Sequence, residues 1–141
     1  IKPGQRFSQM VSSYDFMPTL LDYLGVAAPE DRHRAGESYA GLLRGKSYQD
    51  REDLYFEYEY VRSIRTRRWK YIHRVEGWPS ELFDLQKDPG ETRNILDTAE
   101  GKRIAGQLAV KLQAFFERKG APPIEQWRTT TRQVLPRYSR Y

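Results

Sequence analysis

The chain contains no cysteine among its 141 residues, and this absence removes several kinds of chemistry together. Without a thiol it can form no disulfide, bind no metal through a thiolate and use no cysteine nucleophile. Its two histidines, His33 and His73, are far apart in the sequence and match no zinc-ligand spacing. The GxSxG, P-loop, GxGxxG and HExxH motifs are also missing. We therefore expect no catalytic residue and no metal ligand in this chain.

Long apolar runs are missing too. No stretch approaches the roughly 18 apolar residues of a membrane-spanning helix, and no signal-peptide pattern is present, so we expect no membrane partner. The composition is polar, with 38% hydrophobic and 30% charged residues and a mean hydropathy of −0.83, which predicts a modest core. The 10 Tyr, 6 Phe and 3 Trp nevertheless argue against disorder, because disordered chains are poor in aromatics.

Acidic residues are outnumbered, which gives a net charge of +5 and a pI near 9.5. A surface of this sign favours anions such as nucleic acids, acidic polysaccharides or sulfate esters. Basic residues interleaved with Tyr and Trp are typical of single-strand binders, so a stand-alone nucleic-acid-binding module is one alternative. These basic residues are Arg62, Arg65, Arg67, Arg68, Lys70 and Arg74.

Two observations weigh against that alternative. Carboxylates just upstream can pair with the basic residues across neighbouring strands, and no RNP, KH or helix-turn-helix pattern occurs. These carboxylates are Asp50, Glu52, Asp53, Glu57 and Glu59. We therefore expect no nucleic-acid partner, and we expect Arg65 to brace the sheet or a domain interface.

The centre of the sequence alternates in a way that predicts strands. The alternating runs are residues 54–60, 61–66, 69–73 and 81–85, with a weaker one at 7–12. The polar residues 66–68 predict a hairpin turn between the second and third runs. After the fourth run, Asp88-Pro89-Gly90-Glu91 is a strong turn signal, in which we expect Gly90 to take a positive φ.

The longest predicted helix spans residues 98–119, and Gly120 with Pro122 and Pro123 ends it. Asp97 and Glu100 resemble a capping box at its start. Gly106 inside the helix costs about 1 kcal/mol relative to alanine, which suggests close packing on the sheet. The predicted buried stripe consists of Ile104, Leu108, Leu112, Phe115 and Phe116.

Two shorter helices are predicted near the start of the chain. The first, residues 16–24, has a cap at Asp15, a stop at Gly25 and a stripe of Met17, Leu20, Leu21 and Leu24. The second, residues 39–44, follows a cap at Ser38.

Two quoted segments resemble the sulfatase family. RSIRTRRWKYI followed by ELFDLQKDPGETRNI resembles the family's "RT…WKYI" hairpin and "LYDL..DPGE..N" turn. Upstream, VSSYDFMPTLLDYLGV is similar to "VSHVDLAPTLLDLAGV" in the same family. The resemblance runs from about Ile1 to Trp127, with the segments in the family's order and spacing. It identifies the chain as the C-terminal region of a sulfatase, in the alkaline phosphatase superfamily.

The resemblance implies a division of the chain. Residues 1–47 would be the end of a larger catalytic α/β domain, 48–120 the C-terminal subdomain and 121–141 a tail. We thus expect an α+β fold: a small antiparallel sheet of about four strands packed against a long C-terminal helix, preceded by a helical remnant of the larger domain. In such a fragment the stripe of the helix at 16–24 should lack a partner.

The same resemblance implies the chemistry of the whole protein. Sulfatases use a Cys or Ser converted to formylglycine in a C/S-x-P-x-R motif, together with Ca²⁺, and no such motif can be placed here. We expect formylglycine and Ca²⁺ in a missing N-terminal part, an N-terminal catalytic domain as partner, and this segment alone to be inactive. The substrate would be a sulfated small molecule or carbohydrate. An exported or periplasmic location is implied by the family alone.

The family's loop after the "WKYI" strand lies at the mouth of the active site, and here it comprises residues 74–80. Arg74 could pair with an anionic sugar, Trp78 could stack on a ring, and His73 could donate a hydrogen bond. The structural alternatives are a solvated Arg74, a Trp78 that covers the sheet and a His73 on the strand surface. The tail after Trp127 is a second candidate for substrate contact. A related phosphonate or phosphate monoester hydrolase would share this C-terminal design and remains an alternative.

Overall fold

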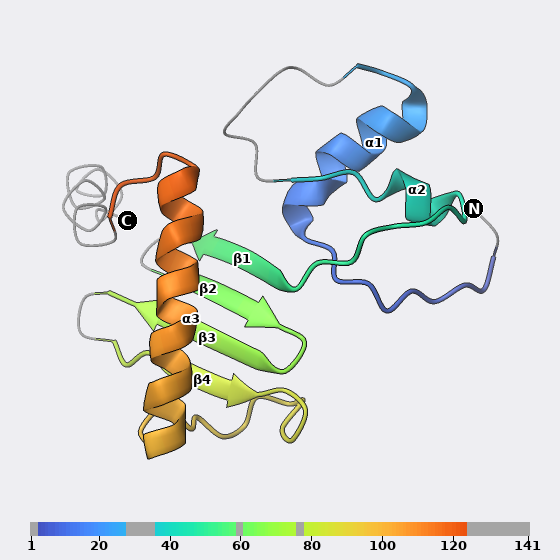
Figure 1. Cartoon of the computed structure of the whole chain (residues 1–141). Coiled ribbons are helices and arrows are strands. Elements are labelled where there is room, and N and C mark those ends of the chain that lie inside the picture. The colour runs from blue at the N-terminus through green and yellow to red at the C-terminus, as the bar shows by residue number, and fades with distance from the viewer. Residues whose placement is uncertain (1–2, 28–35, 59–60, 76–77, 124–141) are drawn as a thin grey trace, which may run out of the picture. The chain divides into compact units, whose positions relative to one another are not determined.

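The computed structural model describes residues 3–27, 36–58, 61–75 and 78–123 (Figure 1). Its contacts divide the chain into two compact units, Ile1–Leu54 and Tyr55–Tyr141. Helices and an antiparallel sheet occur together, which confirms the predicted α+β class. The predicted domain boundaries at residues 47 and 120 remain predictions. His33, Trp127 and the tail at 124–141 lie outside the described residues.

Four strands form one sheet, as the alternation predicts, and their order in it is β1-β2-β3-β4. They are β1 (Asp53–Tyr58), β2 (Val61–Thr66), β3 (Trp69–Arg74) and β4 (Glu81–Asp84). β2 and β3 form the predicted hairpin, with Ile64 opposite Tyr71, and β4 continues the antiparallel pairing with Leu82 opposite Tyr71. This register brings the three apolar side chains to the same face of the sheet.

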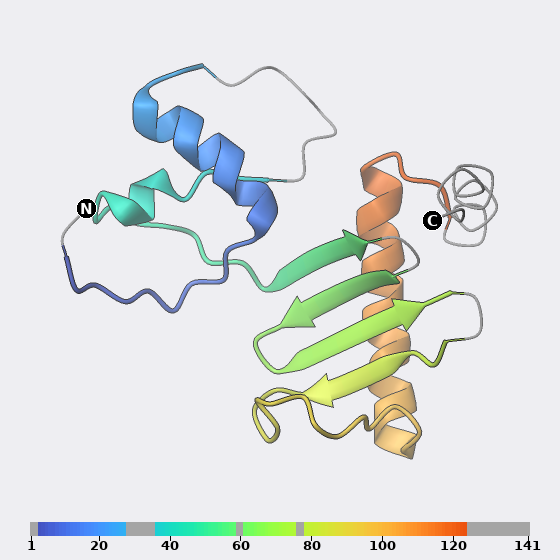
Figure 2. The same cartoon turned by 180° about the vertical axis from the view of Figure 1, so that it is seen from behind.

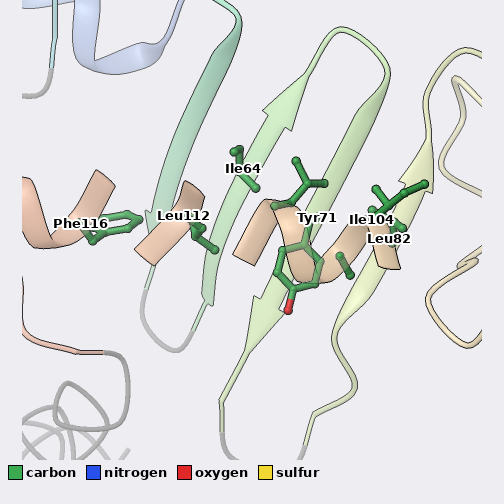
Figure 3. Packing of buried hydrophobic residues seen from close by; sticks show 8 residues of the cluster. Ile64, Tyr71, Leu82, Ile104, Leu112 and Phe116 are labelled. Carbon is green, nitrogen blue, oxygen red and sulfur yellow. The ribbon is translucent and has the colours of Figure 1, made fainter. Parts of the chain in front are cut away.

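The long helix α3 (Ala99–Arg118) crosses that face, and the reverse view shows it behind all four strands (Figure 2). The core of the unit lies between them (Figure 3). Burial of each large aliphatic or aromatic side chain stabilises the fold by about 1.5–3 kcal/mol. The core consists of Ile64, Tyr71, Leu82, Ile104, Ala105, Leu108, Leu112 and Phe116. The predicted stripe of α3 is thus the buried one, with Phe115 partly buried beside it.

Aromatic stacking attaches the first strand to the same helix. The rings of Tyr55 in β1 and Phe115 in α3 stack with centroids 3.9 Å apart and an interplanar angle of 3°. Phe115 also packs edge-on against Phe116, with centroids 5.3 Å apart. Aromatic pairs add about 0.5–1.5 kcal/mol beyond the burial of their area.

The turn after β4 differs from the prediction in one residue. Glu91, and not Gly90, has the positive φ, at 54°. Asp88 organises the turn, because its backbone oxygen accepts from the Glu91 amide and its carboxylate accepts from the Arg93 amide and the Thr92 hydroxyl. The Glu91 carboxylate contacts the Lys70 ammonium of β3, so the left-handed residue is held by an ion pair.

The start of α3 also differs from the prediction. Thr98, and not Asp97, is the N-cap, and its hydroxyl accepts from the amide of Gly101 at 2.9 Å. Gly106 does not pack on the sheet, because a Cβ built there meets no atom within 4 Å. The close approach is at Gly101, where a Cβ would lie 2.0 Å from the carbonyl oxygen of Ile95.

The described residues of the first unit contain three short helical elements, η1 (Ser13–Asp15), α1 (Phe16–Leu24) and α2 (Ala40–Leu43). The helix prediction for 16–24 is confirmed, and Gly25 ends it with a φ of 71°. The predicted strand at 7–12 is wrong, because these described residues form no strand. Asp15 does not cap α1 but closes a capping box in η1, where its carboxylate accepts from the Ser12 amide.

Candidate functional site

The predicted substrate loop connects β3 to β4, and its described part includes Trp78, Pro79 and Ser80. The Trp78 side chain is 73% exposed. An indole this open does not cover the sheet, so the structural alternative for Trp78 is wrong. A large exposed aromatic ring is suited to stacking on a planar or apolar partner.

Arg74 lies at the last position of β3, where the loop begins, and makes an ion pair with Glu81 at the first position of β4. Its Nε and Nη2 both donate to Oε2 of Glu81, at 3.1 and 2.6 Å. The Arg74 amide donates to the hydroxyl of Ser80 at 3.2 Å. Both side chains of the pair remain about one third exposed, at 34% and 27%. The pair presents charged donors and acceptors to solvent while its net charge is close to zero.

His73 lies on the other face of the sheet, because neighbouring residues in a strand point to opposite faces. It shares the α3 side with Tyr71, and its Nδ1 lies 3.1 Å from the Tyr71 hydroxyl. Burial raises the pKa of that phenol. The structure therefore places Trp78 in the loop and Arg74 at the end of β3 where the loop begins. His73 lies on the opposite face of the sheet from Arg74.

The basic residues of the central strands are mostly engaged with carboxylates. Arg62 approaches Glu57 at 3.3 Å, which confirms one expected cross-strand pair. Three more pair with residues downstream rather than with the upstream carboxylates: Arg68 with Asp84, Lys70 with Glu91 and Arg74 with Glu81. The apparent basic patch of the sequence is thereby largely neutralised in the fold.

One of these pairs closes the β2–β3 turn against β4. The Arg68 guanidinium lies 4.3 Å from the Trp69 ring centroid, and its Nη2 donates to Oδ2 of Asp84 at 3.0 Å. The hydrogen bond from Arg68, helped by the amides of Gln86 and Lys87, holds the pKa of Asp84 below its usual value. The Asp84 carboxylate thus connects β4 to the β2–β3 turn through Arg68 and to the segment after β4 through Gln86, so its role is structural.

The first unit contains a buried carboxylate, Asp15, for which the sequence predicted only the role of a helix cap. Asp15 is fully buried, and its carboxylate accepts from the Ser12 amide, the Glu37 amide and Nη2 of Arg51. The two last bonds are 2.9 and 2.8 Å long. No signal in the sequence indicates these contacts, because Arg51 and Glu37 are far from Asp15 along the chain and only the fold brings them together.

Among residues 3–27, 36–58, 61–75 and 78–123, no three His, Asp or Glu side chains gather as a metal-binding group. None of the helices there is long and apolar enough to cross a membrane.

Comparison with known families gives a direct match. The model of the family described as N-sulphoglucosamine sulphohydrolase, C-terminal, matches residues 1–118. A Delta 4,5-hexuronate-2-O-sulfatase of Bacteroides thetaiotaomicron is 35% identical over 113 residues, which cover 74% of this chain and 23% of the relative. The chain thus spans about a quarter of the length of that relative.

Solved structures share the fold. A structure described as a complex with D-glucosamine-2-N,6-O-disulfate is 29% identical, with a TM-score of 0.62 over 75% of this chain and 24% of its own. A phosphonate monoester hydrolase of Silicibacter pomeroyi is 24% identical, with a TM-score of 0.71 over 84% of this chain and 27% of its own. At this identity the second likeness shows the fold alone. With the family model covering most of its length, the chain belongs to the sulfatase family, as a C-terminal sulfatase domain.

Proposed function

We propose that this domain is the C-terminal part of an enzyme that hydrolyses sulfate esters, and that it completes the fold and forms part of the wall of the substrate cleft. The family match to residues 1–118 carries this proposal. The nucleophile lies in another part of the protein. In such an enzyme formylglycine would supply the nucleophile and Ca²⁺ would offset the charge on the sulfuryl oxygens.

Neither group belongs to the residues described here. The chain has no C/S-x-P-x-R motif, and its described carboxylates and histidines form no group of three that could hold a metal ion. The proposal therefore assigns no reaction step to this domain. Its contribution is binding: it presents side chains to the part of the substrate beyond the sulfate.

Trp78 and Arg74 make the proposed substrate contact, and His73, which lies on the opposite face of the sheet and bonds to Tyr71, is not part of it. The 73% exposed indole can stack on a sugar ring, and the Arg74–Glu81 pair can exchange hydrogen bonds with hydroxyl or sulfate oxygens. A sulfated sugar is the favoured class of substrate, because one solved relative was determined with D-glucosamine-2-N,6-O-disulfate.

A chimera tests the function. The matched segment of the Bacteroides Delta 4,5-hexuronate-2-O-sulfatase is replaced by residues 1–141, and sulfate release is measured. The chimera should turn over and the chain alone should not. Turnover by the isolated chain would contradict the assignment of the nucleophile to another part of the protein. A folded chimera without activity would contradict the sulfatase assignment of this domain.

The substrate contact is tested in the same chimera by Trp78→Ala. Loss of one ring contact is worth about 0.5–1.5 kcal/mol, so KM should rise roughly 2- to 10-fold with kcat nearly unchanged. The matched control is Val110→Ala, because Val110 is 70% exposed on α3 and belongs to no proposed site. Equal KM values for the two variants would show that Trp78 does not contact the substrate.

A further inference from the structure

Two aromatic side chains of the second unit are largely exposed to solvent. Tyr58 is 74% exposed and Trp78 is 73% exposed, and no other aromatic side chain in the described part of that unit exceeds 36%. A single exposed ring is ordinary on a protein surface. Two such rings near one another indicate a surface that binds a partner with flat apolar faces.

Both rings lie at the same end of the sheet. Tyr58 is the last residue of β1 and Arg74 the last residue of β3, and the arrowheads of these two strands point the same way in Figure 2. Trp78 belongs to the loop that follows β3 at this end, and Glu81 begins β4 there. Since neighbouring strands lie about 4.8 Å apart, β1 is roughly 10 Å from β3 and roughly 14 Å from β4. We call these four residues the sheet end.

Tyr58 points to the same side of the sheet as the ion pair of Arg74 and Glu81. Tyr55 stacks on α3, so Tyr58, three positions later in the same strand, points to the face away from α3. Arg74 points there too, because Tyr71 is buried against α3 three positions earlier in β3. The sheet end therefore presents the ring of Tyr58 and the ion pair on one face, away from the core.

The ion pair at the sheet end keeps one donor and one acceptor unused. Nε and Nη2 of Arg74 both donate to Oε2 of Glu81. Nη1 of Arg74 and Oε1 of Glu81 have no hydrogen-bond partner among the residues that the structure describes. A guanidinium only donates and an ionised carboxylate only accepts, so each of the two atoms can bind a hydroxyl group. The Glu81 carboxylate would repel a sulfate group, and the pair therefore suits a sugar with free hydroxyls.

A ligand that reaches from Trp78 to Tyr58 must be longer than one sugar. A sugar ring is not much wider than the spacing between neighbouring strands, roughly 5 Å, whereas β1 lies two strands from β3 and three from β4. A monosaccharide held by Trp78 and the ion pair leaves Tyr58 uncovered, and a second linked sugar is needed to reach it. Single-stranded nucleic acid also stacks on aromatic rings, but its phosphates need unpaired cations, and here Arg74 is neutralised by Glu81.

We propose that the sheet end binds two linked sugars, and that the sulfatase to which this domain belongs takes sulfated oligosaccharides in preference to sulfated monosaccharides. This inference rests on the proposed function and adds Tyr58 and Glu81 to the contacts given there. Trp78 and the ion pair hold one sugar, and the ring of Tyr58 stacks on the next. Tyr58 thereby sets the preference for chain length.

Binding to the full chain, 1–141, tests the sheet end without any catalytic step. The two probes are D-glucosamine-2-N,6-O-disulfate and a tetrasaccharide in which that sugar alternates with 2-O-sulfated hexuronate and a Δ4,5-hexuronate forms the end. Both are titrated by NMR. Tyr58→Ala should weaken tetrasaccharide binding about 2- to 10-fold, as for one ring contact, and leave monosaccharide binding unchanged. Trp78→Ala should weaken both, and the exposed control Val110→Ala on α3 should change neither.

The opposite results would overturn the proposal. No binding of the tetrasaccharide would do so, and so would binding that Tyr58→Ala leaves unchanged, because attraction to the positive chain alone does not depend on this ring. A loss of the same size for both probes would show that Tyr58 does not contact a second sugar.

Two further variants separate stacking from a change in the fold. Tyr58→Phe keeps the ring and should bind the tetrasaccharide like the wild type. Tyr58→Leu keeps an apolar side chain without the ring and should show the same loss as Tyr58→Ala. The thermal midpoints should all be close to that of the wild type, because the side chain is 74% exposed. Weaker binding by Tyr58→Phe, or a clearly lower midpoint of Tyr58→Leu, would overturn the stacking role.

The chimera with the Bacteroides relative distinguishes this inference from the proposed function. Its substrates are the same tetrasaccharide and the 2-O-sulfated Δ4,5-hexuronate monosaccharide. Tyr58→Ala should raise KM about 2- to 10-fold for the tetrasaccharide alone, with kcat nearly unchanged. An equal rise for both substrates would overturn the inference. A chimera that releases no sulfate would contradict only the proposed function, since the binding of the probes to the chain still decides the role of Tyr58.

Discussion

Arg62 lies over the ring of Phe116, with the guanidinium carbon 4.3 Å from the ring centroid. This arginine is only 3% exposed, approaches Glu57 of β1 at 3.3 Å and donates to the carbonyl of Pro122 at 3.2 Å. One side chain of β2 therefore contacts the edge strand, the end of α3 and the segment that follows it. Arg65, to which the sequence analysis assigned the bracing role, is exposed on the other face.

Arg62→Met should lower the free energy of unfolding by about 2 kcal/mol, because Glu57 and the Pro122 carbonyl lose a buried cation. Methionine keeps much of the contact with Phe116, so the loss reports on charge and hydrogen bonding rather than on volume. Arg65→Met is the control, with an expected change within about 0.5 kcal/mol. Urea unfolding measures both, and equal losses would contradict the assignment.

Gly101→Ala should destabilise the protein by about 1–3 kcal/mol, although alanine is the better helix former. The reason is the carbonyl oxygen of Ile95, 2.0 Å from the position of the new Cβ. Gly106→Ala in the same helix meets no atom within 4 Å and should stabilise by about 0.5–1 kcal/mol. Opposite signs in thermal unfolding are the expected result. Stabilisation by both variants would mean that the start of α3 is less tightly packed than the structure shows.

Asp84 should contribute to stability in a pH-dependent way. Its pKa is lowered in the fold, chiefly by Arg68, so the contribution is present above the unfolded value of about 3.9 and is lost as the pH falls through the folded pKa. Arg68→Met should move the pKa of Asp84 upward in a carboxyl NMR titration. Asp88 is the internal control, because the Arg93 and Thr92 amides, not Arg68, lower its pKa. A parallel rise of both would indicate a general loss of structure.

Asn94 joins the segment after the turn to the edge strand β4. Its Oδ1 accepts from the amides of Leu82 and Leu96, each at 3.0 Å, and its Nδ2 donates to the Ser80 carbonyl at 3.3 Å. Asn94→Ala should cost about 2 kcal/mol, since the Leu82 and Leu96 amides lose their acceptor. Asn94→Asp keeps the acceptor and should cost about 1 kcal/mol or less. Chemical unfolding separates the two, and an alanine variant as stable as the wild type would exclude this role.

The motif by which the family is recognised therefore has a physical basis. In DPGETRN, Asp88 accepts from the Arg93 amide and the Thr92 hydroxyl, Glu91 pairs with Lys70, and Asn94 binds the edge of β4. Turn residues with short polar side chains predict the existence of the turn. Which residue takes the positive φ does not follow from the residue types of the turn, and for this reason the expectation for Gly90 was wrong.

Local pattern was sufficient for the elements. Alternation predicted all four strands and the β2–β3 hairpin, because the side-chain period of a strand is two. The 3.6-residue period of Ile104, Leu108 and Leu112 predicted both α3 and its buried side. The cap was misplaced by one residue, to Asp97 instead of Thr98, because both residue types are good caps and only the backbone geometry distinguishes them.

The amino-acid sequence by itself determined the α+β class, the order of the elements and membership of the sulfatase family, since these depend on neighbours along the chain and on motif spacing. Only the tertiary structure decided that Arg74 pairs with Glu81, that His73 faces α3 and that Asp15 forms an ion pair with Arg51. Each of these contacts joins residues whose side-chain directions follow from strand register and helix orientation. A sequence records which charges are available, but the fold determines which of them meet.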